Sequence, residues 1–374
     1  MNDPFCIKYP FFRNAVQFLR LTTANFASSI EQQTTAIDGR YFSKVMEYTE
    51  LGSSGVFVSA LTYGAFAIGG TMWGGNAKKD SIAAIHASLD EGVTSIDTAP
   101  FYGLGRSEEM IGEAIKGKNR DQIQILTKFG LVWDQSNQGR GEYFFDAEEQ
   151  GNTVPVYKYT ARTAIIKELE ESLHRLGTDY IDLLQVHWPD ATTPIDETME
   201  ALATLLQQGK IRAAGVCNYS LDQLKEAERT LSLASEQVSY SMLNRSIEAD
   251  IVPYTQKKNL SIIAYSPLER GLLTGKYFKD SQLKADDHRN GYFGQFPAEK
   301  IKTFLAAITP LAEAKGATVS QLVLRWTTLQ PGISVVLAGA RNATQAIENA
   351  QAMHVDIRAE EMTFINQQLE TVYA

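Results

Sequence analysis

The sequence predicts an α/β protein with a (β/α)8 barrel of the TIM type, long βα loops and a C-terminal helix. From Met46 onwards, short apolar strands alternate with amphipathic helices, and eight such strand–helix units follow one another. Their combined length, on the order of 300 residues, matches a barrel with insertions. A doubly wound parallel sheet also alternates strands and helices, but rarely through eight such even units.

The predicted strands are short runs of apolar and β-branched residues bounded by turns. They lie at 59–64, 93–97, 122–129, 180–188, 210–218, 236–241, 260–266 and 333–339. The predicted helices repeat apolar residues at three- and four-residue spacing, as Ile82, Ile85 and Leu89 do in the first of them. They lie at 78–91, from 107, at 161–176, 196–208, from 220, and at 247–258, 297–315, 318–329, 343–353 and 359–371.

Two long loops, 133–160 and 267–296, interrupt this alternation. The first is polar and also contains aromatic residues, and we expect it to shape the substrate pocket. Aromatic residues that could line such a pocket are Phe66, Trp73, Trp133, Tyr143 and Trp188, with ordinary packing as the alternative.

Residues 1–45 differ from the rest of the chain. Their phenylalanines follow no helical or strand period, and Arg13 and Arg20 interrupt any secretory apolar region. No acidic residue occurs between Pro4 and Ile30, which leaves a transit peptide as an alternative. We expect residues 1–45 to be a disordered N-terminal extension and residues 46–374 to form the barrel, with a hairpin at its start.

The composition narrows the class of protein. The apolar and charged fractions, 44% and 21%, are those of a globular protein, and a formal charge of -9 argues against nonspecific binding to nucleic acid or to an anionic membrane. No apolar run reaches the roughly 20 residues of a membrane-spanning helix. The two cysteines, Cys6 and Cys217, form no disulfide framework, so we expect a cytoplasmic protein.

Ionisable side chains lie at the ends of three successive predicted strands. Asp97 ends the second strand, and Lys128 and His187 lie near the ends of the third and fourth. Tyr102 follows Asp97 by five positions in a loop rich in proline and glycine. Because loops after the strand C-termini form the active site of a (β/α)8 barrel, these side chains are expected to meet there. Each alone has a structural explanation, such as a turn cap or packing, but the four together indicate a catalytic group.

The residue types indicate which reaction this group suits. A phenol with its ordinary pKa near 10 is a poor proton donor at neutral pH, and an adjacent ammonium lowers that pKa. Asp97 would hold Lys128 and offset its burial, and His187 would hydrogen-bond a carbonyl oxygen. The group therefore suits protonation of a carbonyl oxygen while a hydride reaches its carbon. It contains no obvious activated nucleophile, which argues against acyl transfer.

Long stretches of the chain resemble the aldo-keto reductase superfamily, and within it the branch of bacterial general stress protein and vegetative aldo/keto reductases. The matching stretches are SIDTAPFYGLGRSEEMIGEAI, ILTKFG, ELEESLHRLGTDYIDLLQVHWPD, GKIRAAGVCNYS, IIAYSPLERGLLTGK and GARNATQAIEN. They span almost the whole predicted barrel and leave residues 1–45 outside. The resemblance implies a catalytic tetrad of Asp97, Tyr102, Lys128 and His187, with Tyr102 as the general acid. It also implies NADP(H), with NAD(H) as the alternative, lying extended across the barrel mouth.

The resemblance further implies a set of cofactor contacts at matching positions. They are Asn218 and Gln237 at the nicotinamide carboxamide, Tyr265 on the nicotinamide ring, Ser266, Leu268, Gly271 and Leu272 at the pyrophosphate, and Gly339, Arg341, Gln345 and Asn349 at the adenosine end. Arg341 is the candidate for a 2′-phosphate, because arginine suits phosphate and a helix begins nearby.

Three functions are consistent with these residues. The first is an NADPH-dependent oxidoreductase that reduces aldehydes or ketones to alcohols. The second is a cofactor-bound interaction module, since the fold also resembles the cytoplasmic β subunits of potassium channels. The third is a sugar dehydrogenase that uses NAD(P)+ in the oxidative direction with the same tetrad. No metal site is expected, because the histidines show no metal-ligand spacing, and the substrate and oligomeric state stay open.

Overall fold

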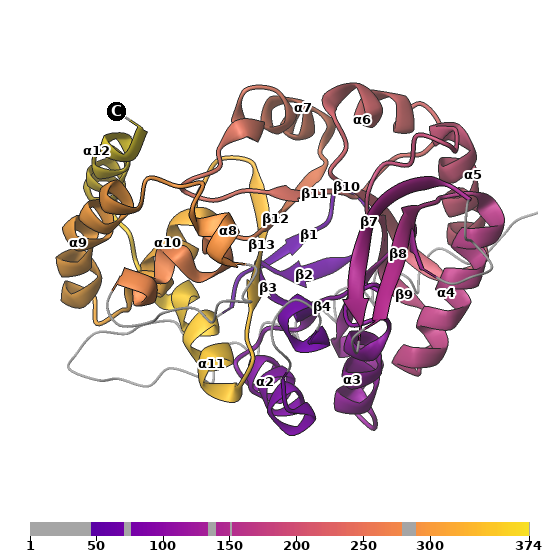
Figure 1. Cartoon of the computed structure of the whole chain (residues 1–374), viewed down its shortest axis with the longest axis horizontal. Coiled ribbons are helices and arrows are strands. Elements are labelled where there is room, and N and C mark those ends of the chain that lie inside the picture. The colour runs from indigo at the N-terminus through magenta and orange to yellow at the C-terminus, as the bar shows by residue number, and fades with distance from the viewer. Residues whose placement is uncertain (1–45, 71–75, 134–139, 150–151, 279–288, 374) are drawn as a thin grey trace, which may run out of the picture. The chain divides into compact units, whose positions relative to one another are not determined.

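Eight parallel strands close into a barrel, as the sequence predicts (Figure 1). The computed structural model describes residues 46–70, 76–133, 140–149, 152–278 and 289–373, so the expectation for residues 1–45 lies outside it. Around the barrel the strands are β3 (Leu61–Gly64), β4 (Ser95–Asp97), β5 (Gln124–Phe129), β9 (Ile181–Val186), β10 (Ile211–Cys217), β11 (Ser235–Ser239), β12 (Ser261–Tyr265) and β13 (Ile333–Gly339). Each strand pairs in parallel with the next, and β13 pairs with β3 to close the ring.

Helices connect consecutive strands and surround the barrel (Figure 1). They are α2 (Lys78–Asp90), α3 (Arg106–Ile115), α4 (Arg162–Leu176), α5 (Ile195–Gln207), α6 (Leu221–Ala227), α7 (Ile251–Lys258), α9 (Ala298–Ala314), α10 (Val319–Thr328), α11 (Ala343–Gln351) and the C-terminal α12 (Ala359–Tyr373). Capping boxes define two of the helix starts: Ser220 and Thr318 accept hydrogen bonds from the backbone of Gln223 and Gln321 at 3.3 and 3.2 Å. Among the described residues, no helix has the length and apolar character needed to cross a membrane.

The barrel interior is apolar at one end and polar at the other. The N-terminal hairpin, β1 (Tyr48–Glu50) and β2 (Phe57–Ser59), contributes Leu51, Val56 and Val58 to a buried cluster with inward-facing strand residues such as Leu126 and Leu183. Inward-facing residues alternate along a strand, so Lys128 and Gln185 follow these two leucines on the same face, nearer the carboxyl ends. The hairpin therefore closes the amino end of the barrel, and the polar layer lies at the carboxyl end.

The loop predicted over 133–160 contains a β-hairpin instead. Strands β7 (Glu142–Glu149) and β8 (Asn152–Lys158) pair antiparallel, and the short β6 (Leu131–Val132) pairs with the end of β8. Pro155 argues against a strand in the sequence, yet it lies where β8 has β7 as its neighbour and β6 does not reach. The alternation of Phe145 and Ala147 with charged residues was the signal for this hairpin.

Two further elements differ from the predicted pattern. Helix α7 begins at Ile251, four residues later than predicted, because residues Ser246–Glu248 form a separate 3-10 turn, η4. The second long loop contains the 3-10 turns η5 (Glu269–Thr274) and η6 (Lys276–Phe278) and the short helix α8 (Arg289–Phe293). Pro253 lies in the first turn of α7, where a proline is tolerated, and Gly271 and Gly275 interrupt the periodicity of the second loop.

Candidate active site

The structure brings the four predicted catalytic side chains together at the carboxyl end of the barrel. Asp97 is the last residue of β4, Lys128 lies in β5, and His187 directly follows β9. Lys128 Nζ donates hydrogen bonds to Asp97 Oδ1 at 2.6 Å, to the carbonyl oxygen of Thr98 at 2.8 Å and to Tyr102 Oη at 3.2 Å. All three ammonium protons of Lys128 thus have an acceptor, one of which is the Tyr102 hydroxyl.

The ring of Tyr102 contacts two other aromatic rings. Its centroid is 4.8 Å from that of Phe66 and 5.8 Å from that of His187, and the His187 ring is nearly perpendicular to it at 78°. These contacts restrict the direction in which the Tyr102 hydroxyl points. The His187 ring therefore lies beside the Tyr102 ring.

The second oxygen of Asp97 contacts two glutamines inside the barrel. Asp97 Oδ2 accepts a hydrogen bond from Gln237 Nε2 at 2.8 Å and a longer one from Gln185 Nε2 at 3.5 Å. Gln237 was predicted as a cofactor contact, whereas Gln185 was not predicted at all. Gln185 shares a strand face with His187, and this two-residue period was the signal that could have found it.

Close backbone contact fixes the turn that carries Tyr102. Gly103 has φ +66°, and a Cβ atom there would lie 2.1 Å from the carbonyl oxygen of Gly69. No residue with a side chain fits this position without movement of the backbone. Below the turn, the buried carboxylate of Glu108 accepts hydrogen bonds from Thr127 and Arg175, both at 2.7 Å, which ties α3 to β5 and α4.

The pKa of Tyr102 differs from the expectation. Burial raises this pKa, the charge of Lys128 lowers it, and Asp97 raises it again, with the net result of a pKa raised to about 12. The predicted net lowering is therefore wrong, although Lys128 acts in the predicted direction. The sequence indicated the charged partner but not that burial of the phenol outweighs the effect of that charge on its pKa.

The other two titrating groups have pKa values set by the same environment. Burial lowers the pKa of Lys128, but the charge of Asp97, the neighbouring Tyr102 and Cys217 and the hydrogen bond to Asp97 together outweigh it, and the pKa of Lys128 is raised. Burial, together with the charge of Lys128, holds the pKa of His187 well below its ordinary value. At neutral pH, Lys128 is therefore an ammonium and His187 a neutral imidazole.

Three of the predicted nicotinamide contacts lie next to this group. Asn218, at the end of β10, donates a hydrogen bond from Nδ2 to the carbonyl oxygen of His187 at 3.1 Å. Its Oδ1 accepts one from Tyr265 Oη at 3.0 Å. Together with Gln237, these residues place two amides and an aromatic ring beside Tyr102 and His187.

The residues predicted at the pyrophosphate lie in the turn after β12. Ser266 and Gly271 have positive φ angles of 59° and 97°, and two of the four residues between them, Glu269 and Arg270, also have positive φ. The N–H groups of Glu269 and Gly271 donate to the carbonyl oxygens of Ser266 and Leu268, both at 2.9 Å, so the turn is held by its own hydrogen bonds. The side chains of Leu268 and Leu272 pack against the core, so it is their backbone groups that would face a ligand at this turn.

The residues predicted at the adenosine end surround the start of α11. The backbone N–H of Arg341 donates to Gln345 Oε1 at 2.9 Å, and Asn349 Nδ2 donates to the carbonyl oxygen of Gly339 at 3.0 Å. Asn76 Nδ2 donates to the carbonyl oxygen of Arg341 at 2.9 Å and joins this turn to the start of α2. An arginine beside a helix N-terminus suits a phosphate group.

The order of the strands shows whether these residues fit one dinucleotide. Asn218, Gln237 and the turns after β12 and β13 come from β10, β11, β12 and β13, which are consecutive in the barrel. Their donors therefore follow one rim of the barrel, from the amides near Tyr102 to the arginine at α11. An extended ligand with an anionic group at the α11 end fits this arrangement.

A second hydrophobic cluster, with several aromatic side chains, packs against Tyr102. Phe101, Leu131, Ala147 and Val156 form a small cluster, and partly buried residues pack against it, namely Tyr102, Leu104, Trp133, Phe144, Phe145 and Trp188. Of the predicted pocket aromatics, Trp133 and Trp188 belong to this cluster and Phe66 contacts Tyr102 directly. Tyr143 is 55% exposed outside the cluster, and Trp73 lies outside the described residues.

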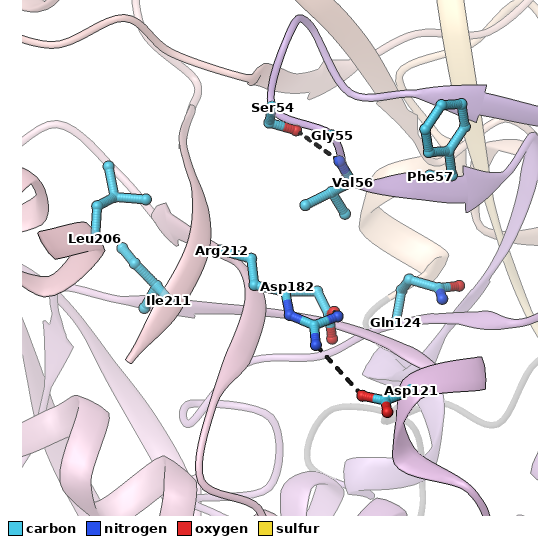
Figure 2. A pocket seen from close by; sticks show the side chains of 10 residues that line it. All are labelled: Ser54, Gly55, Val56, Phe57, Asp121, Gln124, Asp182, Leu206, Ile211 and Arg212. Carbon is cyan, nitrogen blue, oxygen red and sulfur yellow. Dashed lines mark hydrogen bonds and ion pairs between the residues drawn. The ribbon is translucent and has the colours of Figure 1, made fainter. Parts of the chain in front are cut away.

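A separate hollow of about 590 Å³ lies at the amino end of the barrel, beside the turn between β1 and β2 (Figure 2). Asp182 on its wall accepts hydrogen bonds from Arg120 at 2.7 Å and from Arg212 at 3.2 Å, and Arg212 also contacts Asp121 at 3.4 Å. These ion pairs join the starts of β9 and β10 to the segment before β5. The hollow therefore lies at the end of the barrel opposite the polar layer, and not at the end where barrel active sites form. Among the described residues, no group of three acidic, histidine or cysteine side chains is arranged to hold a metal ion.

Comparisons with known proteins agree with the fold and with the predicted resemblance. A model of the aldo/keto reductase family matches residues 60–370. Aldo-keto reductase YhdN of Bacillus subtilis (strain 168) is 40% identical over 331 residues, which cover 87% of this chain and 94% of that protein. NADH-specific methylglyoxal reductase of Escherichia coli (strain K12) is 32% identical over 335 residues, which cover 87% of this chain and 99% of that protein.

A solved structure supports the same family and fold. The glycerol dehydrogenase AKR11B4 from Gluconobacter oxydans matches with a TM-score of 0.77 and 37% identity, over 87% of this chain and 95% of that one. The chain belongs to the aldo/keto reductase family, whose members are oxidoreductases that bind nicotinamide cofactors.

Proposed function

We propose that the protein is an NADPH-dependent oxidoreductase that reversibly reduces aldehydes or ketones to alcohols, with Tyr102 as the general acid. The observation that supports it best is the 3.2 Å contact between the Lys128 ammonium and the Tyr102 hydroxyl, with Asp97 on the far side of Lys128 at 2.6 Å. This arrangement gives a proton donor a permanent positive charge at the atom where negative charge develops.

Each residue of the group has one task in this proposal. Tyr102 Oη gives its proton to the carbonyl oxygen of the substrate, and Lys128 stabilises the phenolate that this leaves. Asp97 holds Lys128 in place, and the neutral His187 hydrogen-bonds the same carbonyl oxygen. The bound cofactor supplies the hydride to the carbonyl carbon.

The residues along the rim hold the cofactor in this proposal. Asn218 and Gln237 bind the nicotinamide carboxamide, and Tyr265 packs on the ring. The turn from Ser266 to Leu272, with Leu268 and Gly271, binds the pyrophosphate through its backbone. Arg341, with Gly339, Gln345 and Asn349, binds the adenosine end, and its guanidinium favours NADPH over NADH by pairing with the 2′-phosphate.

Two relatives indicate which substrates and which direction to test first. One relative is named as NADH-specific and as acting on methylglyoxal, and one structure is named as a glycerol dehydrogenase. These names favour small carbonyl compounds and polyols as the first substrates to test. The aromatic cluster beside Tyr102 suits the apolar parts of larger substrates.

An absorbance assay at 340 nm, with NADPH and NADH each tested against a panel of aldehydes, ketones and polyols, tests cofactor, substrate class and direction together. We expect NADPH oxidation with at least one class of carbonyl compound. Turnover with NADH alone would contradict the role of Arg341. Negligible turnover with every substrate, together with a stable protein partner in a pulldown, would instead favour the interaction module.

The raised pKa of Tyr102 predicts different pH profiles for the two directions. Reduction needs the protonated phenol, and since the pKa is about 12, kcat/KM for reduction should be constant between about pH 6 and pH 9. Oxidation needs the phenolate, so its kcat/KM should rise about tenfold per pH unit in the same range. Steady-state rates in both directions, in buffers of constant ionic strength, measure this. A reduction rate that falls with a midpoint near neutral pH would contradict the assignment of Tyr102.

A further inference from the structure

Glu236 is a buried carboxyl group that has no role in the chemistry described so far. It lies in β11, directly before Gln237, and its exposed fraction is 0%. Because side chains alternate along a strand, Glu236 faces away from the barrel interior, into which Gln237 points. A carboxyl group in such a place is costly unless it makes a hydrogen bond that the fold needs.

The partner of Glu236 is the backbone of the turn after β10. Glu236 Oε1 accepts a hydrogen bond from the backbone N–H of Tyr219 at 3.0 Å. The preceding residue, Asn218, donates its own N–H to the carbonyl oxygen of Gln237 at 3.1 Å. Two consecutive residues of β11 therefore hold two consecutive N–H groups of this turn.

The turn needs such support because Asn218 has a left-handed backbone conformation, with φ +61°. Asparagine tolerates this conformation better than most residues, but not without a cost in free energy. Its side chain has to reach both the carbonyl oxygen of His187 and the hydroxyl of Tyr265. A small rotation of the backbone at Asn218 would move the amide away from both.

The hydrogen bond from the Tyr219 N–H is the main polar contact of the Glu236 carboxyl group. Within the described part of the chain, Glu236 Oε2 has no hydrogen-bond partner. Burial raises the pKa of Glu236 well above its ordinary value, against the lowering effect of the backbone hydrogen bonds. A neutral side chain with one acceptor oxygen in the same place should therefore serve equally well, whereas an apolar one would leave the Tyr219 N–H unpaired.

We propose that Glu236 is a positioning residue for the cofactor: by accepting the Tyr219 N–H it fixes the left-handed turn at Asn218, and so sets the affinity of the site for the nicotinamide end. This inference rests on the proposed function, because it assumes that Asn218 binds the carboxamide. It concerns one end of the dinucleotide and not the other, since Arg341 and α11 lie after β13, two strands from β11 in the barrel.

The test compares Glu236→Leu and Glu236→Gln in the full-length protein, with NADPH and 2′,5′-ADP as probes in isothermal titration calorimetry. Leucine removes the acceptor and should raise the Kd for NADPH about tenfold, which is the usual worth of one hydrogen bond to a buried N–H. Glutamine keeps an acceptor oxygen and should leave this Kd within about twofold of wild type. The Kd for 2′,5′-ADP, which lacks the nicotinamide, should not change in either variant.

Glu168→Leu is the matched control. Glu168 is a second buried carboxyl group with a raised pKa, and its two oxygens accept the backbone N–H of Gly130 at 3.1 Å. Its removal breaks the same kind of hydrogen bond after β5, away from Asn218, and should leave the Kd for NADPH unchanged. If Glu236→Leu does not fold, the flexible Glu236→Met removes the same acceptor and gives the same comparison.

Three results with the variants would overturn the inference. They are an unchanged Kd for NADPH in the leucine or methionine variant, an equal loss of affinity for both probes, or a glutamine variant as weak as the leucine variant. A wild-type protein that binds 2′,5′-ADP and NADPH equally well would overturn it as well, because the nicotinamide end would then add no affinity. A wild-type protein that binds neither probe would refute the proposed function itself.

Discussion

Replacing Tyr102 with phenylalanine should lower kcat for carbonyl reduction by about 10²–10⁴-fold, the usual contribution of a general acid. The variant loses only the hydroxyl that Lys128 contacts at 3.2 Å, and the ring keeps its contacts with Phe66 and His187. Single-turnover reduction followed at 340 nm measures this loss without interference from product release.

The affinity for NADPH provides the control for this variant. The hydroxyl of Tyr102 is not part of the predicted cofactor contacts, so the Kd for NADPH should stay within about threefold of wild type. A Tyr102→Phe protein with undiminished turnover would contradict the role of Tyr102. A protein that had also lost NADPH binding would show that the substitution disturbs more than proton transfer.

The sequence predicted those features of the fold that depend on period and on strand order. Alternating strands and helices identified the barrel, and the rule that chemistry lies at the carboxyl ends of the strands brought Asp97, Lys128 and His187 to one place. The contacts of Lys128 with Asp97 and Tyr102 follow from this placement. A charged residue at a buried strand end needs a partner, and the sequence offered one on the neighbouring strand.

The features that the sequence did not predict depend on packing in three dimensions. The sequence does not predict the β7–β8 hairpin, because Pro155 argues against a strand and the alternation of apolar and charged residues there is short. The predicted direction of the net shift in the Tyr102 pKa was wrong, because this shift depends on the burial of the phenol, which the sequence does not show. The sequence assigned no role to Glu236 or Gln185, because a polar residue within a short apolar strand has no evident function until its neighbours are known.

Replacing Lys128 with methionine should reduce both activity and stability, and the two losses can be separated. The ion pair between Lys128 and Asp97 is almost completely buried, with side chains 1% and 2% exposed. Methionine fills the space of the lysine stem but leaves the carboxylate of Asp97 without its cation. Removing one partner of a buried ion pair typically lowers the free energy of unfolding by about 3–5 kcal/mol, and we expect a loss of this size. Urea denaturation followed by circular dichroism measures it.

The double variant Asp97→Asn/Lys128→Met distinguishes the electrostatic cost from the catalytic one. Asparagine removes the uncompensated charge and still accepts the hydrogen bond from Gln237 Nε2, which in wild type contacts Asp97 Oδ2 at 2.8 Å. The double variant should therefore be more stable than Lys128→Met alone, a non-additive effect that double-mutant cycles detect. Its turnover should stay at least about 10²-fold below wild type, because no ammonium stabilises the Tyr102 phenolate. If activity returned together with stability, Lys128 would hold the fold and not the proton donor.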